Sequence, residues 1–222
     1  MKILINGDSN MAGEELADKS QAIGAQLCRL LGGQEINLAL TGASNDRIYN
    51  TTVEFVKENP NIDLVVIGWS EVSRVQWFLT NRGVPEFVEV NNLGVGRWEY
   101  PPEYNQRLEH WHQSGTNMDY RTGLSHYWHE RIYNLHKYLE HLQIPHVFFN
   151  AFHEFMIPDP QYQLDWNHCF VSPYDPTDTY VDFCQAHNYK EITPGWYHFE
   201  AAAQLAWAQR VFAHVQQHGR TR

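Results

Sequence analysis

The sequence predicts an α/β protein: a three-layer α/β/α sandwich with a central parallel sheet. Three observations predict this class. Strand-like and helix-like segments alternate over residues 1–68, an order typical of a parallel sheet with right-handed crossovers. The third strand-like segment, 63–68, is apolar on both faces, as a central strand covered by helices must be. The 222 residues, 43% of them hydrophobic, suffice for one sizeable core.

The elements of the first half have local signals of their own. Residues 2–5 are apolar and β-rich and predict a buried first strand. The helix expected at 20–31 has apolar residues at helical spacing and ends at a pair of glycines. A short apolar run at 35–40 predicts the second strand. Ser44 is a favourable N-cap for the next helix, which extends to about residue 58.

The second half is less regular. Residues 70–123 and 153–194 are rich in aromatic residues and show no clear period, and long irregular segments are often functional. Between them, helical spacing predicts a helix at 124–142, and residues 145–149 predict a fourth strand. An Ala-rich helix is expected at 198–217. We therefore expect a single domain, 1–222, with a flavodoxin-like strand order and aromatic insertions.

Composition excludes several classes of partner. The formal net charge is -10, from 26 acidic and 16 basic residues, which disfavours nucleic acid and anionic membrane surfaces. The longest apolar runs have the length of strands, so we expect no membrane span. Three widely spaced cysteines indicate a reducing compartment, and Met1 and Lys2 lead directly into the first strand without a signal peptide. We expect a cytoplasmic protein.

Three polar turns follow the first three strands. They begin at Gly7, at Thr41 and at Gly68. The carboxyl ends of parallel strands share one edge of the sheet, where α/β proteins bind ligands, so these turns are expected to converge there. His198 stands just before the last helix and is expected to reach the same edge.

The order of these blocks resembles the SGNH (GDSL-type) hydrolase superfamily. The chain has Gly-Asp-Ser after its first strand, a glycine turn after its second and a histidine before its last helix. The resemblance implies that Ser9 is the nucleophile, His198 the general base and the Gly42 amide an oxyanion donor. The segments around Gly42 and Trp69 also look like SGNH-like proteins of tailed bacteriophages, which implies a phage-infected host cell or a phage particle as a further location.

Two positions depart from the pattern of that superfamily. Its third block provides an asparagine as oxyanion donor, whereas this chain has Ser70, so Ser70 and Asn45 are both candidates for that role. Its last block provides an aspartate three residues before the histidine, whereas this chain has Gly195. Asp182 and Asp178 are upstream acids that we consider as substitutes.

Two function classes follow from this comparison. The first is a serine esterase that hydrolyses a small or carbohydrate-borne ester, such as an O-acetyl group, without metal or cofactor. Trp69 and Trp196 lie nearest the turns and are candidates for a substrate wall. The second is a catalytically weak or inactive SGNH fold that serves as a binding or structural module, for example in a phage particle. The departures at Ser70 and Gly195 favour the second class.

The histidines raise the question of a metal site. Among the 13 histidines, His129 and His136 share an expected helix face, but they are seven residues apart, whereas an i, i+4 pair is the better metal-ligand geometry. Hydrogen-bonded histidines are more common than metal ligands, so we expect no metal site.

Overall fold

The structure is a computed structural model that describes residues 1–81, 84–90, 109–110, 113 and 117–219. The aromatic residues at 91–108, part of the first expected insertion, lie outside the described residues. Within the described segments, no helix is long and apolar enough to cross a membrane.

The central sheet has five parallel strands in the order β2-β1-β3-β6-β7. Numbered within the sheet alone, this is the order 2-1-3-4-5, the flavodoxin-like arrangement that the sequence predicts. The strands are β1 (Lys2–Gly7), β2 (Gln34–Asn37), β3 (Leu64–Trp69), β6 (His146–Asn150) and β7 (Phe170–Val171).

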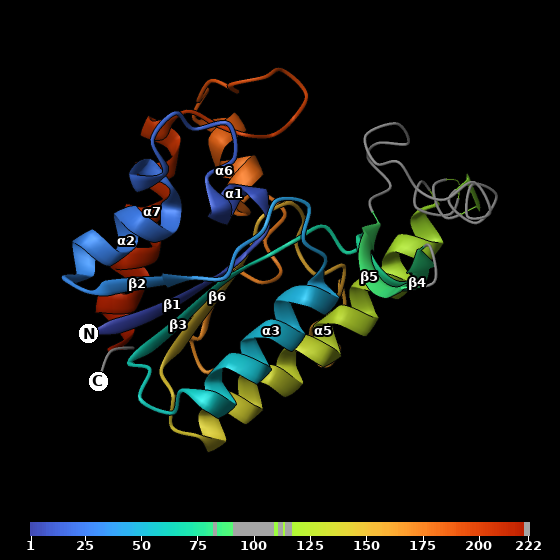
Figure 1. The fold of residues 1–222 in the computed structure, drawn as a ribbon, viewed down its shortest axis with the longest axis horizontal. Helices are drawn as coiled ribbons and strands as arrows, with labels where there is room; N and C mark the ends of the chain where they lie inside the picture. The colour runs from blue at the N-terminus through green and yellow to red at the C-terminus, as the bar shows by residue number, and fades with distance from the viewer. Residues whose placement is uncertain (82–83, 91–108, 111–112, 114–116, 220–222) are drawn as a thin grey trace.

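Helices cover both faces of this sheet (Figure 1). The helices α2 and α7 pack together on one face, and α3 and α5 lie on the other. The predicted three-layer α/β/α class is therefore confirmed. The helices are α1 (Ser9–Ala12), α2 (Ile23–Leu31), α3 (Asn45–Glu58), α5 (Met118–His141), α6 (Tyr180–Ala186) and α7 (Ala201–His218), with short 3-10 helices η1 (Lys19–Gln21) and η3 (Pro160–Tyr162).

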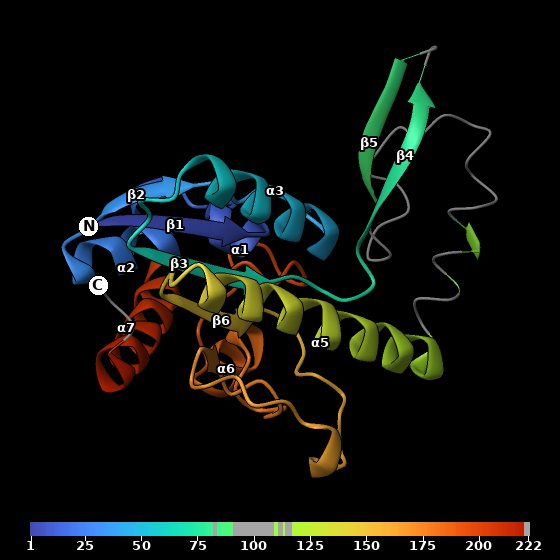
Figure 2. The ribbon, with the colours of Figure 1, turned by 90° about the horizontal axis from the view of Figure 1, so that it is seen from below.

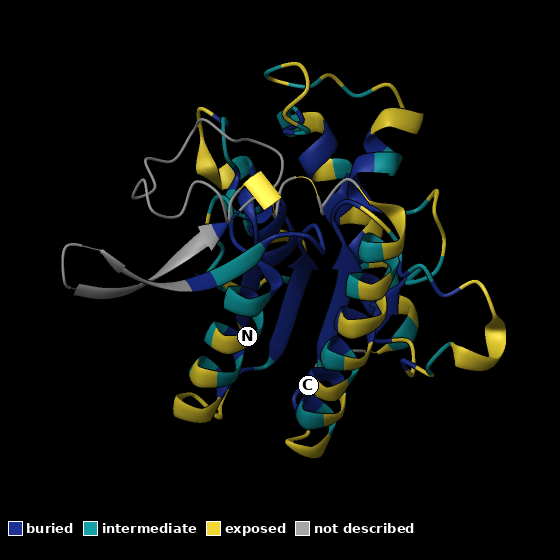
Figure 3. Cartoon of the chain, turned by 90° about the vertical axis from the view of Figure 1, so that its right-hand side faces the viewer, coloured by how far each residue is buried: buried dark blue, intermediate teal, exposed yellow. Residues whose placement is uncertain are grey.

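Alternation along the strands divides the core in two. Ile3 and Ile5 of β1 pack with α2 and α7, whereas Leu4 packs on the opposite side with α3 and α5. All three side chains are fully buried, and Figure 3 shows the buried strands between the partly exposed helices. Burial on both faces explains why the strands read as continuous apolar runs.

The first insertion contains structure that the sequence analysis missed. Residues Val75–Asn81 and Val84–Val90 form an antiparallel hairpin, β4 and β5, which projects from the sheet in Figure 2. The helix α5 begins at Met118, earlier than the expected residue 124, because the Asn117 side chain accepts hydrogen bonds from the amides of the first turn. The second insertion includes η3, β7 and α6.

The last helix begins later than expected. α7 begins at Ala201 rather than at His198. Phe199 instead forms an isolated antiparallel bridge with Glu191, and the His198 carbonyl accepts a hydrogen bond from the Ile192 amide. His198 is therefore held by strand-like contacts just outside the helix.

Candidate active site

Ser9 lies at the carboxyl end of the central strand β1 and is the first residue of α1. The Asp8 side chain caps this short helix by accepting the Asn10 amide at 3.0 Å, as expected for an acid in a polar turn. Within the described residues, the Ser9 amide donates no hydrogen bond, as is usual for the first amides of a helix.

The turn before Ser9 requires a glycine. Gly7 has φ +155°, and a Cβ on Gly7 would lie 2.4 Å from Cγ of Met11 and 2.8 Å from the Gly68 carbonyl oxygen. The backbone of β1 is thus pressed against α1 and β3 at this point, which fixes where the Ser9 segment leaves the sheet.

A buried ion pair also holds the turn between β1 and Ser9 in place. Arg74 Nη1 lies 2.9 Å from Asp8 Oδ2, and both side chains are almost completely buried. The Ser70 hydroxyl donates to Asp8 Oδ2 at 3.1 Å and accepts from Arg74 at 2.9 Å. These contacts tie the turn after β3 to the turn after β1.

The same contacts bear on the two oxyanion candidates. The only proton of the Ser70 hydroxyl is directed at Asp8, so it is not directed at a substrate in this arrangement. The Asn45 amide exchanges two hydrogen bonds with the Ser70 backbone, at 2.8 and 3.1 Å. Asn45 and Ser70 thus hold two of the three turns together.

Two other groups at this edge have hydrogen-bonding capacity to spare. Gly42 has φ +77°, and within the part of the chain that the structure describes its amide makes no hydrogen bond. Asn10, next to Ser9, is 1% exposed, and neither the nitrogen Nδ2 nor the oxygen Oδ1 of its side chain has a hydrogen-bond partner among the described residues. A buried amide without partners is costly to keep.

His198 is paired with a carboxylate. Its Nδ1 lies 3.0 Å from Oε2 of Glu15, and both side chains are largely buried. Glu15 follows α1, and the Glu14 amide donates to the Ser9 carbonyl at 2.9 Å. The pair therefore brings the His198 ring to the end of the short helix that begins at Ser9.

The backbone on both sides of this pair is strained. Glu15 has φ +64°, and Tyr197, which precedes His198, has φ +58°. Residues with side chains adopt this left-handed region at a cost and persist there only when their surroundings enforce it. The Glu15–His198 contact is thus built from two unusual turns that are far apart in the sequence.

The acids considered from the sequence lie elsewhere. The Thr179 hydroxyl donates to Asp182 at the start of α6. Asp178 pairs with Arg210 and accepts a hydrogen bond from Ser172. Asp182 is thus engaged within its own segment and Asp178 by Ser172 and by Arg210 of α7, and within the described residues neither carboxylate contacts His198.

A pocket of about 330 Å³ opens beside Tyr197. Its lining residues are Glu71, Arg121, Phe152, His153, Val181, Asp182, Gln185 and Tyr197. The Phe152 ring also lies under the Arg74 guanidinium, 4.9 Å away, which connects the pocket to the Asp8 turn.

Glu71 is the charged centre of this pocket. It is 4% exposed, and it contacts His153 Nε2 at 3.0 Å and Arg121 at 3.2 Å. Burial raises the pKa of the Glu71 carboxyl, but the hydrogen bond and charge of His153, together with two neighbouring arginines, outweigh it and lower the net pKa. The carboxylate therefore stays ionised inside the pocket.

The two candidate tryptophans differ in their surroundings. Trp69 is 1% exposed and packs edge-to-face on Phe148, so its ring belongs to the core. Trp196 is 40% exposed, with its ring 6.4 Å from the His198 ring. Only Trp196 has a surface that a ligand near His198 is able to touch.

A family model matches residues 3–158, which is more than half of the chain. The chain belongs to this family, DUF6071, a family of unknown function. No curated protein matches the chain.

Solved structures show the fold. The structure of TesA superposes with a TM-score of 0.54 at 12% sequence identity, covering 98% of this chain and 99% of that chain. An esterase, EstA from Pseudoalteromonas sp., has a TM-score of 0.49 at 11% identity, with 97% of each chain covered. A carbohydrate esterase family 2 enzyme from Corynascus thermopiles has a TM-score of 0.44 at 13% identity, with 98% of this chain and 66% of that chain covered. The TesA match spans both chains and agrees with the SGNH-type fold expected from the sequence.

Sequence reasoning missed Glu15 as the partner of His198. The sequence signal was present but weak, since Glu14 and Glu15 are simply two acids that follow Ser9 closely. Acids just before His198 in the sequence were the natural candidates, whereas Glu15 contacts His198 only in the folded chain.

Proposed function

We propose that this protein is a serine ester hydrolase in which Ser9, His198 and Glu15 form the catalytic triad. The contact between Glu15 and His198 Nδ1 carries the proposal. A carboxylate on Nδ1 holds the proton there and leaves the lone pair on Nε2, which is the nitrogen that must accept the proton of a serine.

The mechanism follows from these roles. His198 Nε2 takes the Ser9 hydroxyl proton while Ser9 Oγ attacks the ester carbonyl, and Glu15 stabilises the imidazolium that forms. The imidazolium then gives its proton to the departing alcohol. A water molecule, deprotonated by the same nitrogen, then attacks the acyl carbonyl, and the imidazolium returns its proton to Ser9 Oγ as the carboxylic acid leaves.

The oxyanion needs donors that are not already engaged. We assign this role to the amides of Ser9 and Gly42, with the Asn10 side chain as the third donor. The uncommitted hydrogen-bonding capacity of these three groups supports the assignment. Ser70 and Asn45 then act as supports for the turns, because their polar groups bond to each other and to Asp8.

The pocket beside Tyr197 supports a small, polar substrate. Its charged and amide-bearing lining residues suit hydroxyl groups better than a long acyl chain. We propose a short acyl ester, such as an O-acetyl group on a polar or sugar alcohol, with Trp196 as one wall.

Fluorophosphonate labelling tests the proposal. The wild-type protein should be labelled at Ser9, and Ser9→Ala and His198→Ala should not be labelled. Ser20→Ala, which removes an exposed serine close in sequence, is the matched control and should label normally. Hydrolysis of p-nitrophenyl acetate should follow the same pattern. An unlabelled wild-type protein would overturn the proposal and favour the binding-module class.

A further inference from the structure

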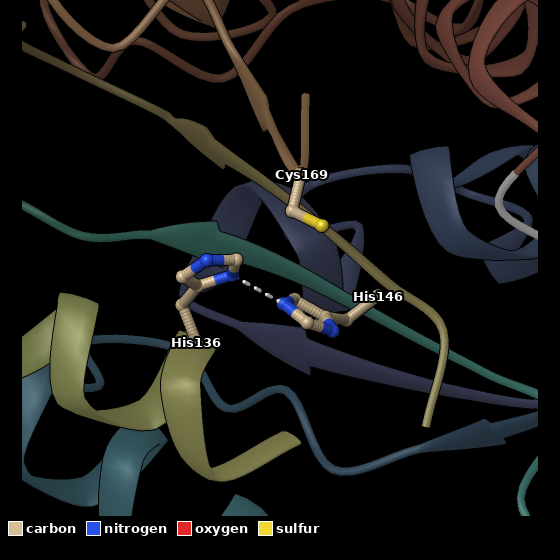
Figure 4. A group of neighbouring side chains, drawn as sticks. All are labelled: His136, His146 and Cys169. Atoms are coloured by element: carbon tan, nitrogen blue, oxygen red, sulfur yellow. Dashed lines mark hydrogen bonds between the residues drawn. The ribbon is translucent and has the colours of Figure 1, made fainter. Parts of the chain in front are cut away.

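Two histidines and a cysteine meet in the core at the opposite end of the sheet from Ser9. His136 comes from α5, His146 opens β6, and Cys169 immediately precedes β7 (Figure 4). All three residues are buried, and their ligand atoms lie within 4.8 Å of one another. None of them lines the pocket beside Tyr197.

The two imidazole rings are tilted by 60° to each other and meet through one nitrogen of each ring. His136 Nδ1 lies 2.8 Å from His146 Nε2, as the dashed line in Figure 4 marks. The outer nitrogen of each ring faces an acceptor. His146 Nδ1 is 2.9 Å from the Ile144 carbonyl oxygen, and His136 Nε2 is 3.6 Å from a Glu140 carboxylate oxygen.

These contacts require more positive charge than two neutral rings supply. The Ile144 carbonyl accepts a hydrogen from His146 Nδ1, and the nearby Glu140 carboxylate favours a hydrogen on His136 Nε2. Two neutral imidazoles then have no hydrogen left, and their inner nitrogens direct lone pairs at each other. A cation between the inner nitrogens removes this repulsion.

The third side chain indicates which cation. Cys169 places its sulfur within 4.8 Å of a ring nitrogen of each histidine, and a mixed imidazole and thiolate set is typical of Zn²⁺. The carbonyl and carboxylate behind the two rings are the outer partners that orient histidine ligands in metal sites. A tetrahedral zinc ion holds two such nitrogens about 3.3 Å apart, so the rings need to separate only slightly.

The backbone of residues 167–169 has an unusual conformation that is fixed by several hydrogen bonds. Asn167 and His168 are consecutive left-handed residues, with φ +47° and +57°. The Cys169 amide and carbonyl are both bonded, to Trp166 and Phe148 respectively. The Asn167 side chain donates to Glu140, the same residue that faces His136. Hydrogen bonds thus hold the loop before β7 to β6 and to α5, the two elements that carry the histidines.

We propose that His136 Nδ1, His146 Nε2 and Cys169 Sγ bind one Zn²⁺ ion. The Cys169 thiol donates to the Asn167 carbonyl at 3.7 Å. Binding displaces that thiol proton to solvent, and the thiolate, two neutral imidazoles and a water complete the coordination. The ion links α5, β6 and the segment before β7, so it stabilises the fold rather than taking part in ester hydrolysis.

Cobalt substitution tests this site. Co²⁺ added to chelator-treated protein should produce a thiolate-to-cobalt charge-transfer band that saturates at one equivalent. Cys169→Ser should lose the band. Cys184→Ser is the matched control, because Cys184 is a buried cysteine packed on the other face of the sheet, and it should keep the band.

A second variant keeps the test decisive if Cys169→Ser does not fold. The double variant Cys28→Ser/Cys184→Ser leaves Cys169 as the sole cysteine and should keep the band. Zn²⁺ at 100-fold excess over its Kd should raise the Tm of the wild-type protein by about 5–10 °C. No band in the wild-type protein, or a band that survives in Cys169→Ser, would overturn the proposal and leave a histidine pair that shares a proton.

Discussion

Replacing Arg74 with methionine tests whether the Asp8–Arg74 pair holds the Ser9 turn. The substitution keeps most of the side-chain volume and removes the charge. Asp8 is completely buried, so Arg74→Met leaves its carboxylate in the core, where Ser70 and the Asn10 backbone amide are the remaining hydrogen-bond donors among the described residues. The pair is therefore expected to matter far more than an exposed one.

The magnitude follows from the contacts that are lost. One hydrogen bond between charged groups contributes about 1.5–3 kcal/mol, and the cation–π contact of Arg74 with Phe152 adds about 1 kcal/mol. The sum is about 2.5–4 kcal/mol, which overlaps the range of about 3–5 kcal/mol for removing one member of a buried pair. Arg210→Met is the matched control, since Arg210 is 39% exposed and pairs with Asp178; it should cost about 1 kcal/mol or less.

Urea unfolding measures both variants. Asp8→Asn and the double variant Asp8→Asn/Arg74→Met complete a double-mutant cycle. The double variant should be less destabilised than the sum of the two single variants, because the uncompensated charge is then absent. An Arg74→Met protein that loses no more stability than Arg210→Met would refute the reasoning.

Three further outcomes are expected. Gly7→Ala should destabilise the protein by several kcal/mol, because its Cβ would lie 2.4 Å from Met11 Cγ. Gly123 lies in α5 with open space where a methyl group would stand, so Gly123→Ala should stabilise the protein by about 0.5–1 kcal/mol in the same urea assay. Equal effects of the two substitutions on the free energy of unfolding would contradict the packing described for Gly7. Burial, with a smaller contribution from a neighbouring histidine, lowers the pKa of His129 from 6.5 to about 4. The folded protein therefore favours neutral His129. This preference contributes about 3 kcal/mol to the free energy of unfolding above pH 6.5, and the contribution should be lost as the pH falls from 6.5 toward 4. His129→Gln should flatten that part of the stability profile in urea unfolding at pH 7 and pH 4.5, and an unchanged slope would show that His129 does not titrate differently on folding.

The sheet and the helix layers were predictable because their signals are local. The apolar strands, the Ser44 cap and the spacing of apolar residues in α5 each belong to one short segment. The β4–β5 hairpin was missed because its residues lie in a long aromatic segment without a clear period.

The site was predictable only in part, because its decisive contacts are non-local. Ser9 and His198 follow from the order of short blocks along the chain. Glu15 reaches His198 across 183 positions, and no spacing rule indicates that contact. His136, His146 and Cys169 likewise come together only in the folded chain. The sequence prediction of no metal site therefore did not group these three residues.

Glu15→Gln tests the proposed triad most directly. The measurement is kcat for p-nitrophenyl acetate over a range of pH, compared with Asp178→Asn, the variant of an acid first considered from the sequence. The account predicts that Glu15→Gln lowers kcat by about 10³–10⁴-fold, because the histidine loses the group that fixes its tautomer. A Glu15→Gln enzyme with wild-type kcat, alongside an Asp178→Asn enzyme that has lost activity, would contradict the proposed triad.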